Sequence, residues 1–168
     1  MDVKSRQWST AANIACRFQY PLGVMFDNQL YVLGGNDPKS VYSCSLNDLL
    51  QSCRSESKEA STQLQSNIIW RKHADLPFYY SDCISLCGHL LAIGGSGHAS
   101  HRKLSKETGS KAVYAYRPTT NSWEVISEMS MARYDCFAVT LPNTNELMVV
   151  GGRSKLNSTN LVEFASLI

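Results

Sequence analysis

The feature that most constrains the fold is a pair of adjacent glycines that ends a short apolar run and occurs three times. The pairs are Gly34-Gly35, Gly94-Gly95 and Gly151-Gly152, and the period is about 55 to 60 residues. The four residues before each pair are all apolar or aromatic. A short, wholly apolar run that ends at glycines is typical of a strand buried on both faces. Such a period predicts a repeat architecture.

Each apolar run lies within a larger repeating pattern. A turn and a strand candidate that begins with Tyr precede each run, at 20–26, 80–86 and 134–140. A loop of variable length and a third strand candidate follow each glycine pair, at 41–44, 113–116 and 161–164. Trp8, Trp70 and Trp123 each begin a fourth strand candidate. The repeating unit is therefore four antiparallel strands, and helical spacing is confined to one short candidate at 47–53, inside an insertion.

These features resemble the kelch repeat, whose hallmarks are the double glycine, a Tyr-containing strand with a turn like DPxTN, and a Trp at fixed offset. The resemblance covers nearly the whole chain. It departs from the pattern at Arg117-Pro118, where kelch repeats have Asp-Pro, and at Cys44, where the third strand should carry Tyr. Kelch repeats are blades of a β-propeller. The resemblance implies an all-β fold, a partial kelch β-propeller with about three four-stranded antiparallel blades.

The strand order predicts how residues 1–168 divide into blades. We expect the last strand of a preceding or shared blade at 1–14, a blade at 18–76 with the insertion at 47–67, a blade at 78–129, and a blade lacking its fourth strand at 132–168. Closed propellers typically have four to eight blades. We therefore expect either a piece of a longer propeller or self-association through open blade edges, and two copies would supply six blades.

Composition narrows the function classes. The net charge of +2 is too small to indicate nucleic-acid binding, and no apolar run approaches the roughly 18 residues that a membrane span needs. The six cysteines include no CxxC pair, so we expect free thiols and a cytoplasmic protein. The four histidines form no metal signature, and no phosphate-binding glycine motif is present. We expect no metal, no cofactor and no enzymatic activity.

The predicted partner site lies on the face that carries the loops after the second and fourth strands of each blade. The resemblance implies that kelch proteins bind partners on this face, and loops on a rigid scaffold commonly carry function. The candidate residues are Arg17, Asn36, Tyr79, Tyr80, His101, Arg102, Arg133, Tyr134 and Arg153. Arg and Tyr dominate binding hot spots. We expect this basic rim to bind an acidic peptide or protein segment through charge-assisted hydrogen bonds; the alternative is a solvated surface without a partner.

The sequence favours a non-enzymatic protein-interaction module. The resemblance implies a substrate-recognition part of a ubiquitin ligase adaptor or a cytoskeletal binder, although no BTB-like helical region occurs in this sequence. The alternative from another class is a carbohydrate-active or glycan-binding propeller, which would need paired carboxylates in a cleft. Asp82 and Asp135 take equivalent places when the repeats are aligned on Tyr80 and Tyr134, and we expect them to be structural.

Overall fold

A computed structural model describes residues 13–14, 21–34, 37–54, 68–79, 81–97, 109–154 and 157–166. The described part consists of antiparallel sheets and one short helix, so the predicted all-β class is confirmed. No helix among the described residues is long and apolar enough to cross a membrane.

The first sheet has the strand order β1-β2-β3-β4. Its strands are β1 (Leu22–Phe26), β2 (Gln29–Leu33), β3 (Val41–Ser45) and β4 (Arg71–Lys72). Asp27 and Asn28 make the tight turn between β1 and β2, and their φ angles of 48° and 54° are those of a two-residue hairpin turn. Most of the fourth strand candidate predicted within 1–14 lies outside the described residues.

The helix α1 (Leu46–Arg54) follows β3 directly and includes the candidate at 47–53. Ser45 caps its start, because the Ser45 hydroxyl accepts a hydrogen bond from the Asp48 amide at 3.3 Å. The Asp48 carboxylate also lies in the first turn, where the helix dipole favours negative charge. The rest of the predicted insertion, 55–67, lies outside the described residues.

The second sheet has the order β5-β6-β7-β8, and the third has the order β9-β10-β13. The second sheet comprises β5 (Asp82–Leu86), β6 (His89–Ile93), β7 (Ser110–Arg117) and β8 (Ser122–Arg133). The third comprises β9 (Phe137–Thr140), β10 (Glu146–Val150) and β13 (Val162–Ser166), beside a two-stranded ribbon of β11 (Arg153–Ser154) and β12 (Asn157–Ser158). β8 continues to Arg133, beyond the end of the blade predicted at 78–129.

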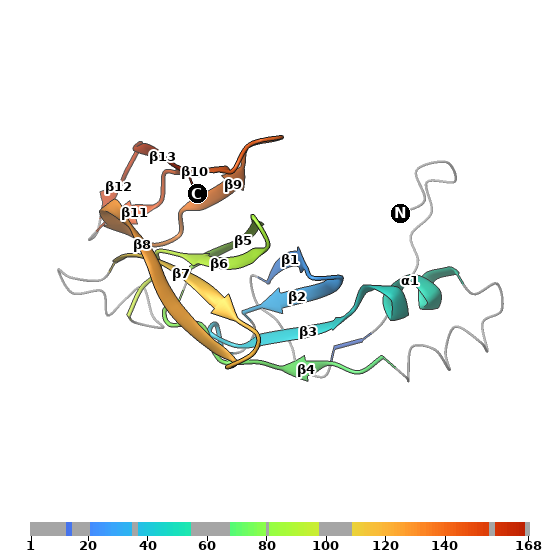
Figure 1. The fold of residues 1–168 in the computed structure, drawn as a ribbon. Helices are drawn as coiled ribbons and strands as arrows, with labels where there is room; N and C mark the ends of the chain where they lie inside the picture. Colours follow the sequence, from blue (N-terminus) through green and yellow to red (C-terminus); the bar gives the residue numbers. More distant parts are fainter. Residues whose placement is uncertain are drawn as a thin grey trace.

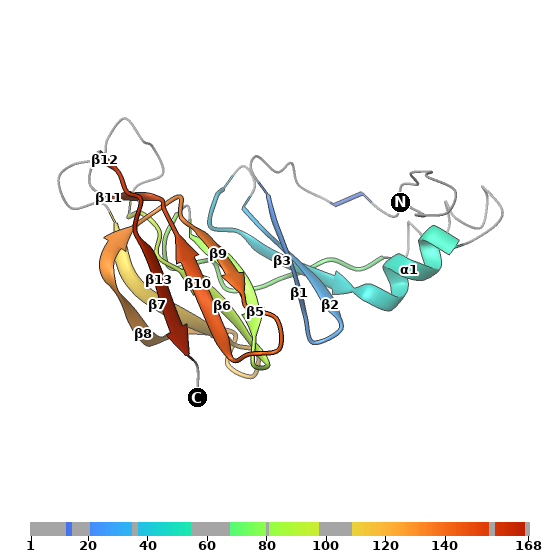
Figure 2. The ribbon, with the colours of Figure 1, turned by 90° about the horizontal axis from the view of Figure 1, so that it is seen from above.

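The three main sheets follow one another in chain order, with the second between the first and the third (Figures 1 and 2). The first strands of successive sheets are neighbours, since β5 contacts both β1 and β9. One apolar cluster, which includes Leu33, Leu90 and Ala92, fills the space between the first and second sheets. A second cluster, which includes Ile93 and Leu147, fills the space between the second and third sheets.

The glycine pairs allow the chain to cross closely between sheets. Gly94 and Gly95 have φ angles of 64° and 111°, which side-chain-bearing residues rarely adopt. A Cβ at Gly94 would lie 2.6 Å from the Arg133 carbonyl oxygen, and one at Gly95 would lie 2.4 Å from the Ser81 hydroxyl oxygen. The connections between sheets therefore pack directly on Gly94, Gly95 and Gly152, which explains why β6 and β10 end at glycine pairs.

The ladders correct one alignment made from the sequence. Tyr79 pairs with Ser96, two residues after Gly94, and Tyr134 pairs with Arg153, two residues after Gly151. Tyr134 is therefore equivalent to Tyr79 and not to Tyr80. Asp82 lies opposite Ile93, and Phe137 lies opposite Val150, so Asp82 is equivalent to Phe137. The equivalence of Asp82 and Asp135 was wrong, because the alignment started from the second of two adjacent tyrosines.

Candidate functional site

Four of the nine predicted site residues are described: Tyr79, Arg133, Tyr134 and Arg153. The other five, namely Arg17, Asn36, Tyr80, His101 and Arg102, lie outside the described residues. The four described residues lie at the glycine corners, where the chain passes from one sheet to the next.

Two repeat-equivalent bridges hold the tyrosines at these corners. The Tyr79 amide donates to the Ser96 carbonyl at 2.8 Å, and the Ser96 amide donates back to Tyr79 at 2.6 Å. The Tyr134 amide donates to the Arg153 carbonyl at 3.0 Å, and the Arg153 amide donates back at 2.8 Å. These paired bonds fix the backbone of both tyrosines relative to the loops that follow the glycines.

A cation lies over each tyrosine ring. The Lys39 ammonium nitrogen is 4.9 Å from the centroid of the Tyr79 ring, and the Arg153 guanidinium carbon is 6.0 Å from the centroid of the Tyr134 ring. Both distances fit cation–π attraction. Lys39 was not among the predicted residues, although Asn36, three residues before it, was. Sequence spacing does not show that Lys39 reaches the next repeat's tyrosine.

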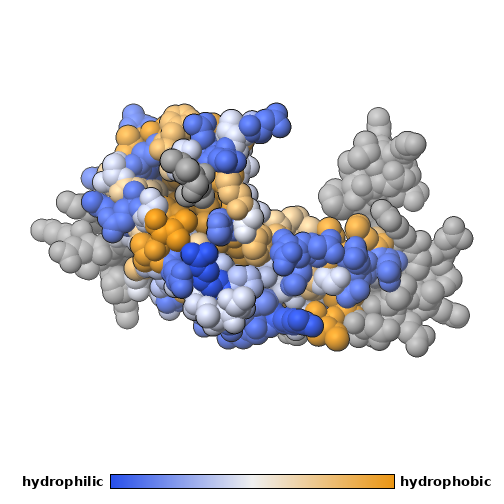
Figure 3. Space-filling view, in the orientation of Figure 1, coloured by the Kyte–Doolittle hydropathy of each residue, from blue (hydrophilic) through white to orange (hydrophobic). Residues whose placement is uncertain are grey.

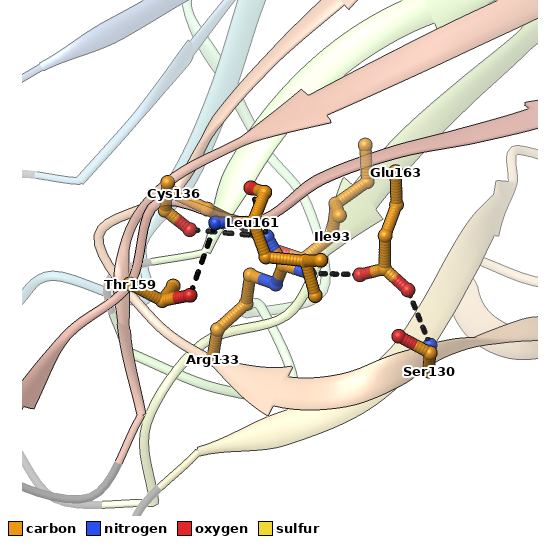
Figure 4. Close-up of polar contacts among 8 residues, drawn as sticks. Ile93, Ser130, Arg133, Cys136, Thr159, Leu161 and Glu163 are labelled. Atoms are coloured by element: carbon orange, nitrogen blue, oxygen red, sulfur yellow. Dashed lines mark hydrogen bonds and ion pairs between the residues drawn. The ribbon is translucent and has the colours of Figure 1, made fainter.

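Arg133 is not a rim residue, which corrects the prediction. Its side chain is fully buried, and its guanidinium makes an ion pair with the Glu163 carboxylate (Figure 4). The Nη1 atom of Arg133 also donates to the carbonyl oxygens of Gly151 at 3.1 Å and Leu161 at 3.2 Å. Glu163 accepts a further bond from the Ser130 amide at 2.6 Å. Arg133 therefore joins the second sheet to the third. Tyr134 has no exposed surface either, and we correct its assignment as a contact residue in the same way.

The repeat register explains why an arginine is buried there. Arg133 is equivalent to Phe78, and Glu163 is equivalent to Tyr114, because Tyr114 lies opposite Ala92 and Glu163 lies opposite Val149. The Phe78 and Tyr114 rings contact each other with centroids 6.2 Å apart. An aromatic pair in one repeat is thus replaced by an ion pair in the next.

A third position changes together with this pair. In the second repeat the Ser81 hydroxyl donates to the Gly94 carbonyl at 3.0 Å. The equivalent residue in the third repeat is Cys136, and the Gly151 carbonyl instead accepts a hydrogen bond from Arg133 Nη1. The sequence contains this signal as a coordinated change at three aligned positions, and the signal is visible only once the tyrosines are aligned correctly.

A second polar cluster, also missed from the sequence, joins the first and second sheets. His73 lies between two hydroxyls, with its Nε2 atom 2.7 Å from Ser43 Oγ and its Nδ1 atom 2.8 Å from the Tyr116 hydroxyl. The Tyr116 hydroxyl donates to Asn121 Oδ1 at 2.7 Å, and the same oxygen accepts from the Ala74 amide at 2.8 Å. Burial lowers the pKa of His73, and Arg71 lowers it further.

Both hydroxyls beside His73 have further side-chain partners. Because the Tyr116 hydroxyl hydrogen points to Asn121, the Tyr116 oxygen accepts from His73 Nδ1–H. The Ser43 hydroxyl donates to Gln29 Oε1 at 2.6 Å, so Gln29 also belongs to this cluster. This cluster occupies an inter-sheet seam and uses its polar groups internally, so its role is structural.

Two further groups of chemical interest are also structural. Asp82 uses both carboxylate oxygens, which accept bonds from the Cys83 amide at 2.8 Å and the Ala138 amide at 2.5 Å. Desolvation raises the pKa of Asp82, and the two backbone bonds oppose this shift. Burial also raises the pKa of the Cys44 and Cys136 thiols to about 11, so both remain protonated. Among the described residues, no cluster of His, Cys, Asp and Glu could hold a metal ion.

The repeated corners and the stacked antiparallel sheets define a class of protein, and comparisons with known proteins agree with it. Residues 77–130 match the family model for the Kelch motif. The solved structure of YjhT superposes with a TM-score of 0.60 at 18% identity, covering 87% of this chain and 38% of that chain. The chain therefore contains a kelch repeat, and its sheets are arranged as blades of a kelch-type β-propeller.

Two curated relatives have different printed functions. The chain is 33% identical over 86 residues to the Kelch repeat and BTB domain-containing protein 12 of Danio rerio, covering 49% of this chain and 14% of that protein. It is 28% identical over 149 residues to the N-acetylneuraminate epimerase of Yersinia enterocolitica, covering 85% of this chain and 33% of that protein. The chain therefore spans a third or less of the length of either relative.

Proposed function

We propose that this chain is a non-enzymatic protein-interaction module that binds an acidic protein or peptide segment on the face carrying the glycine corners. The observation that supports this proposal is the pair of equivalent corners, each with a cation over a tyrosine ring. Lys39 belongs to the first sheet's loop and covers Tyr79, while Arg153 follows the third sheet's glycines and covers Tyr134. Two cations at related places on a rigid scaffold suit an extended segment with spaced carboxylates.

The stacking of each cation has a consequence for binding. A cation held over an aromatic ring loses less side-chain freedom when it pairs with a carboxylate, because its position is already restricted. Because the Tyr134 ring is buried, it contributes through its contact with the Arg153 guanidinium and not through contact with the partner. The five predicted residues outside the described part, among them Arg102, remain members of this proposed site.

The kelch class and the relative that carries a BTB domain support a finer proposal about context. We propose that the chain supplies the substrate-recognition part of a ubiquitin ligase adaptor in the cytoplasm, with cytoskeletal binding as the alternative role in the same class. This proposal rests on family resemblance, which carries less weight than the chemistry of the corners.

Charge reversal at the two corners tests the proposal. Binding of fluorescein-labelled acidic peptides, each paired with a sequence in which Glu and Asp are replaced by Gln and Asn, is followed by fluorescence anisotropy. We expect Lys39→Glu and Arg153→Glu each to weaken binding of the acidic peptides about tenfold and to reduce its salt dependence. Arg117→Glu is the matched control, since Arg117 lies at the turn between β7 and β8, away from the corners. Equal affinities for wild type and both corner variants would contradict the proposal.

A carbohydrate-active role is the second candidate, and the relative that covers most of this chain supports it, because that relative is an N-acetylneuraminate epimerase. Asp82 is a poor candidate for its chemistry, since both carboxylate oxygens are engaged by backbone amides. Proton NMR of N-acetylneuraminate incubated with the purified chain tests this role. Conversion faster than in buffer alone would favour it over the interaction module.

A further inference from the structure

A cavity of about 520 Å³ lies between the first and second sheets, at the strand ends opposite the glycine corners. The glycine corners follow β2 and β6, whereas the cavity is bordered by the tight turns that precede these strands. Phe26 lines it and also packs on the apolar cluster between the two sheets. Ser85 lines it from the second sheet and lies opposite Leu90, a member of the same cluster. The cavity is therefore the open end of an inter-sheet seam.

The helix α1 forms one wall of this cavity. In the second sheet, residues 118–121 connect the third strand to the fourth, whereas in the first sheet α1 begins directly after the third strand. The Leu46 amide donates to the Asn28 carbonyl at 3.1 Å, so the start of the helix is fixed to the β1–β2 turn. Leu46 lines the cavity, and Leu50, one turn later on the same side of the helix, is 38% exposed. The helix therefore adds apolar surface to this end of the seam.

Asp27 adds a negative charge to the apolar lining. It is exposed, and none of the ion pairs among the described residues includes it. Burial raises the pKa of Tyr31, and the charge of Asp27 raises it further. Because Tyr31 belongs to the cluster between the two sheets, the Asp27 charge acts on the seam side of the turn. Figure 3 shows hydrophilic surface, in blue, and hydrophobic surface, in orange, side by side over the first sheet and α1.

We propose that this cavity binds a segment of a partner protein in which a large apolar side chain lies next to Lys or Arg. The apolar side chain contacts Phe26 and Leu46, and the cation pairs with Asp27, which supplies the complementary charge. Pockets for small molecules bury about 70–90% of the ligand surface. Met25, Asp27 and Asn28 line this cavity and are exposed, so it is too open for such a ligand and suits a segment that lies across it.

Three short peptides test the chemistry of this site. The probe is Gly-Lys-Phe-Lys-Gly, and the controls are Gly-Glu-Phe-Glu-Gly, which reverses the charge, and Gly-Lys-Ser-Lys-Gly, which removes the apolar side chain. Each is titrated into the full chain, and amide chemical shifts are followed by NMR. The probe should shift the amides of Asn28, Leu46 and Gly88, with a dissociation constant about tenfold lower than that of either control.

A matched pair of variants tests the role of Asp27. Asp27→Asn removes the charge and keeps a residue type that tolerates the positive φ angle of 48°. It should raise the dissociation constant of the probe about fivefold, which is the effect of one exposed ion pair. Asp135→Asn is the control, because Asp135 is also exposed and has a φ angle of 51° but lies beside a glycine corner. This variant should bind the probe as wild type does.

Several results would overturn the proposal. They are equal affinities for the three peptides, probe-induced shifts that leave Asn28, Leu46 and Gly88 unchanged, and an Asp27→Asn variant that binds the probe as tightly as wild type does. Circular dichroism melting shows that each variant is folded. None of these results bears on whether acidic peptides bind at the corners, which lie at the other ends of the strands.

Discussion

The exchange of an aromatic pair for an ion pair between the second and third repeats gives a test of the repeat register. Arg133→Phe introduces the residue that the second repeat has at this position, Phe78. It removes the guanidinium and leaves the Glu163 carboxylate paired only with the Ser130 amide. Breaking a buried ion pair from one side costs about 3–5 kcal/mol. Because Glu163 retains 18% exposure, we expect a loss of about 3 kcal/mol for this variant.

The single change at the other member of the ion pair should lower the free energy of unfolding further. Glu163→Tyr introduces the counterpart of Tyr114 but leaves Arg133, which has no exposed surface, without its carboxylate. We expect a loss near the upper end of the same range, about 4–5 kcal/mol. The double variant Arg133→Phe with Glu163→Tyr rebuilds the aromatic pair of the second repeat. Its main remaining defect is the Gly151 carbonyl, which loses its bond from Arg133 at a cost of about 1–2 kcal/mol. The Leu161 carbonyl keeps its bond from the Gly151 amide, and the Ser130 amide, which loses Glu163, is on an exposed residue.

A third change should repair that defect. In the second repeat the Ser81 hydroxyl donates to the Gly94 carbonyl, and Cys136→Ser places a hydroxyl at the equivalent position of the third repeat. The free energy of unfolding of the triple variant should therefore lie within about 1 kcal/mol of the wild-type value. Urea unfolding, followed by circular dichroism, measures the free energy of unfolding for all variants. If the double variant loses as much stability as the two single variants added together, the three positions are not equivalent and the register is wrong.

Three further predictions follow from the corners and the seams. Gly95→Ala should cost about 2 kcal/mol or more, because the new Cβ meets Ser81 and the φ angle is 111°, whereas Gly97→Ala, with open space around it, should change the unfolding midpoint little. The free energy of unfolding should be greatest above pH 6.5 and should fall as the pH drops below this value, because the unfolded chain binds a proton at His73 more readily than the folded chain. If wild type and His73→Gln have the same pH profile of stability, this prediction is wrong. A thiol reagent followed by mass spectrometry should label the exposed Cys53 and Cys87 in the folded protein and label Cys44, Cys83 and Cys136 only after unfolding, whereas early labelling of Cys83 would count against the first inter-sheet core.

The strands were predictable because their signals are local. An apolar run followed by two glycines identifies β2, β6 and β10, and residues that favour tight turns identify the reversals before them. Ser45 and Asp48 likewise give the helix a recognisable start. Each of these features depends on neighbours within a few residues, so the sequence alone is sufficient for them.

The site was less predictable because its contacts join different repeats. Arg133 looks like a surface cation until Glu163, thirty residues later, is known to lie beside it. Lys39, which follows β2 of the first sheet, lies over the ring of Tyr79, which precedes the second sheet. His73 likewise contacts Ser43 of the first sheet and Tyr116 of the second sheet. Two adjacent tyrosines also allow the repeats to be aligned one residue out of place, and a slip of one residue exchanges the two faces of a strand.

The register of the glycine corners underlies both the site and the ion-pair exchange, and amide-to-amide nuclear Overhauser effects measure it most directly. Paired backbone bonds bring the amide hydrogens of Tyr79 and Ser96 close together, and likewise those of Tyr134 and Arg153. We predict a strong cross-peak for each of these two pairs. A cross-peak that joins Ser96 to Tyr80 in place of Tyr79 would contradict the account.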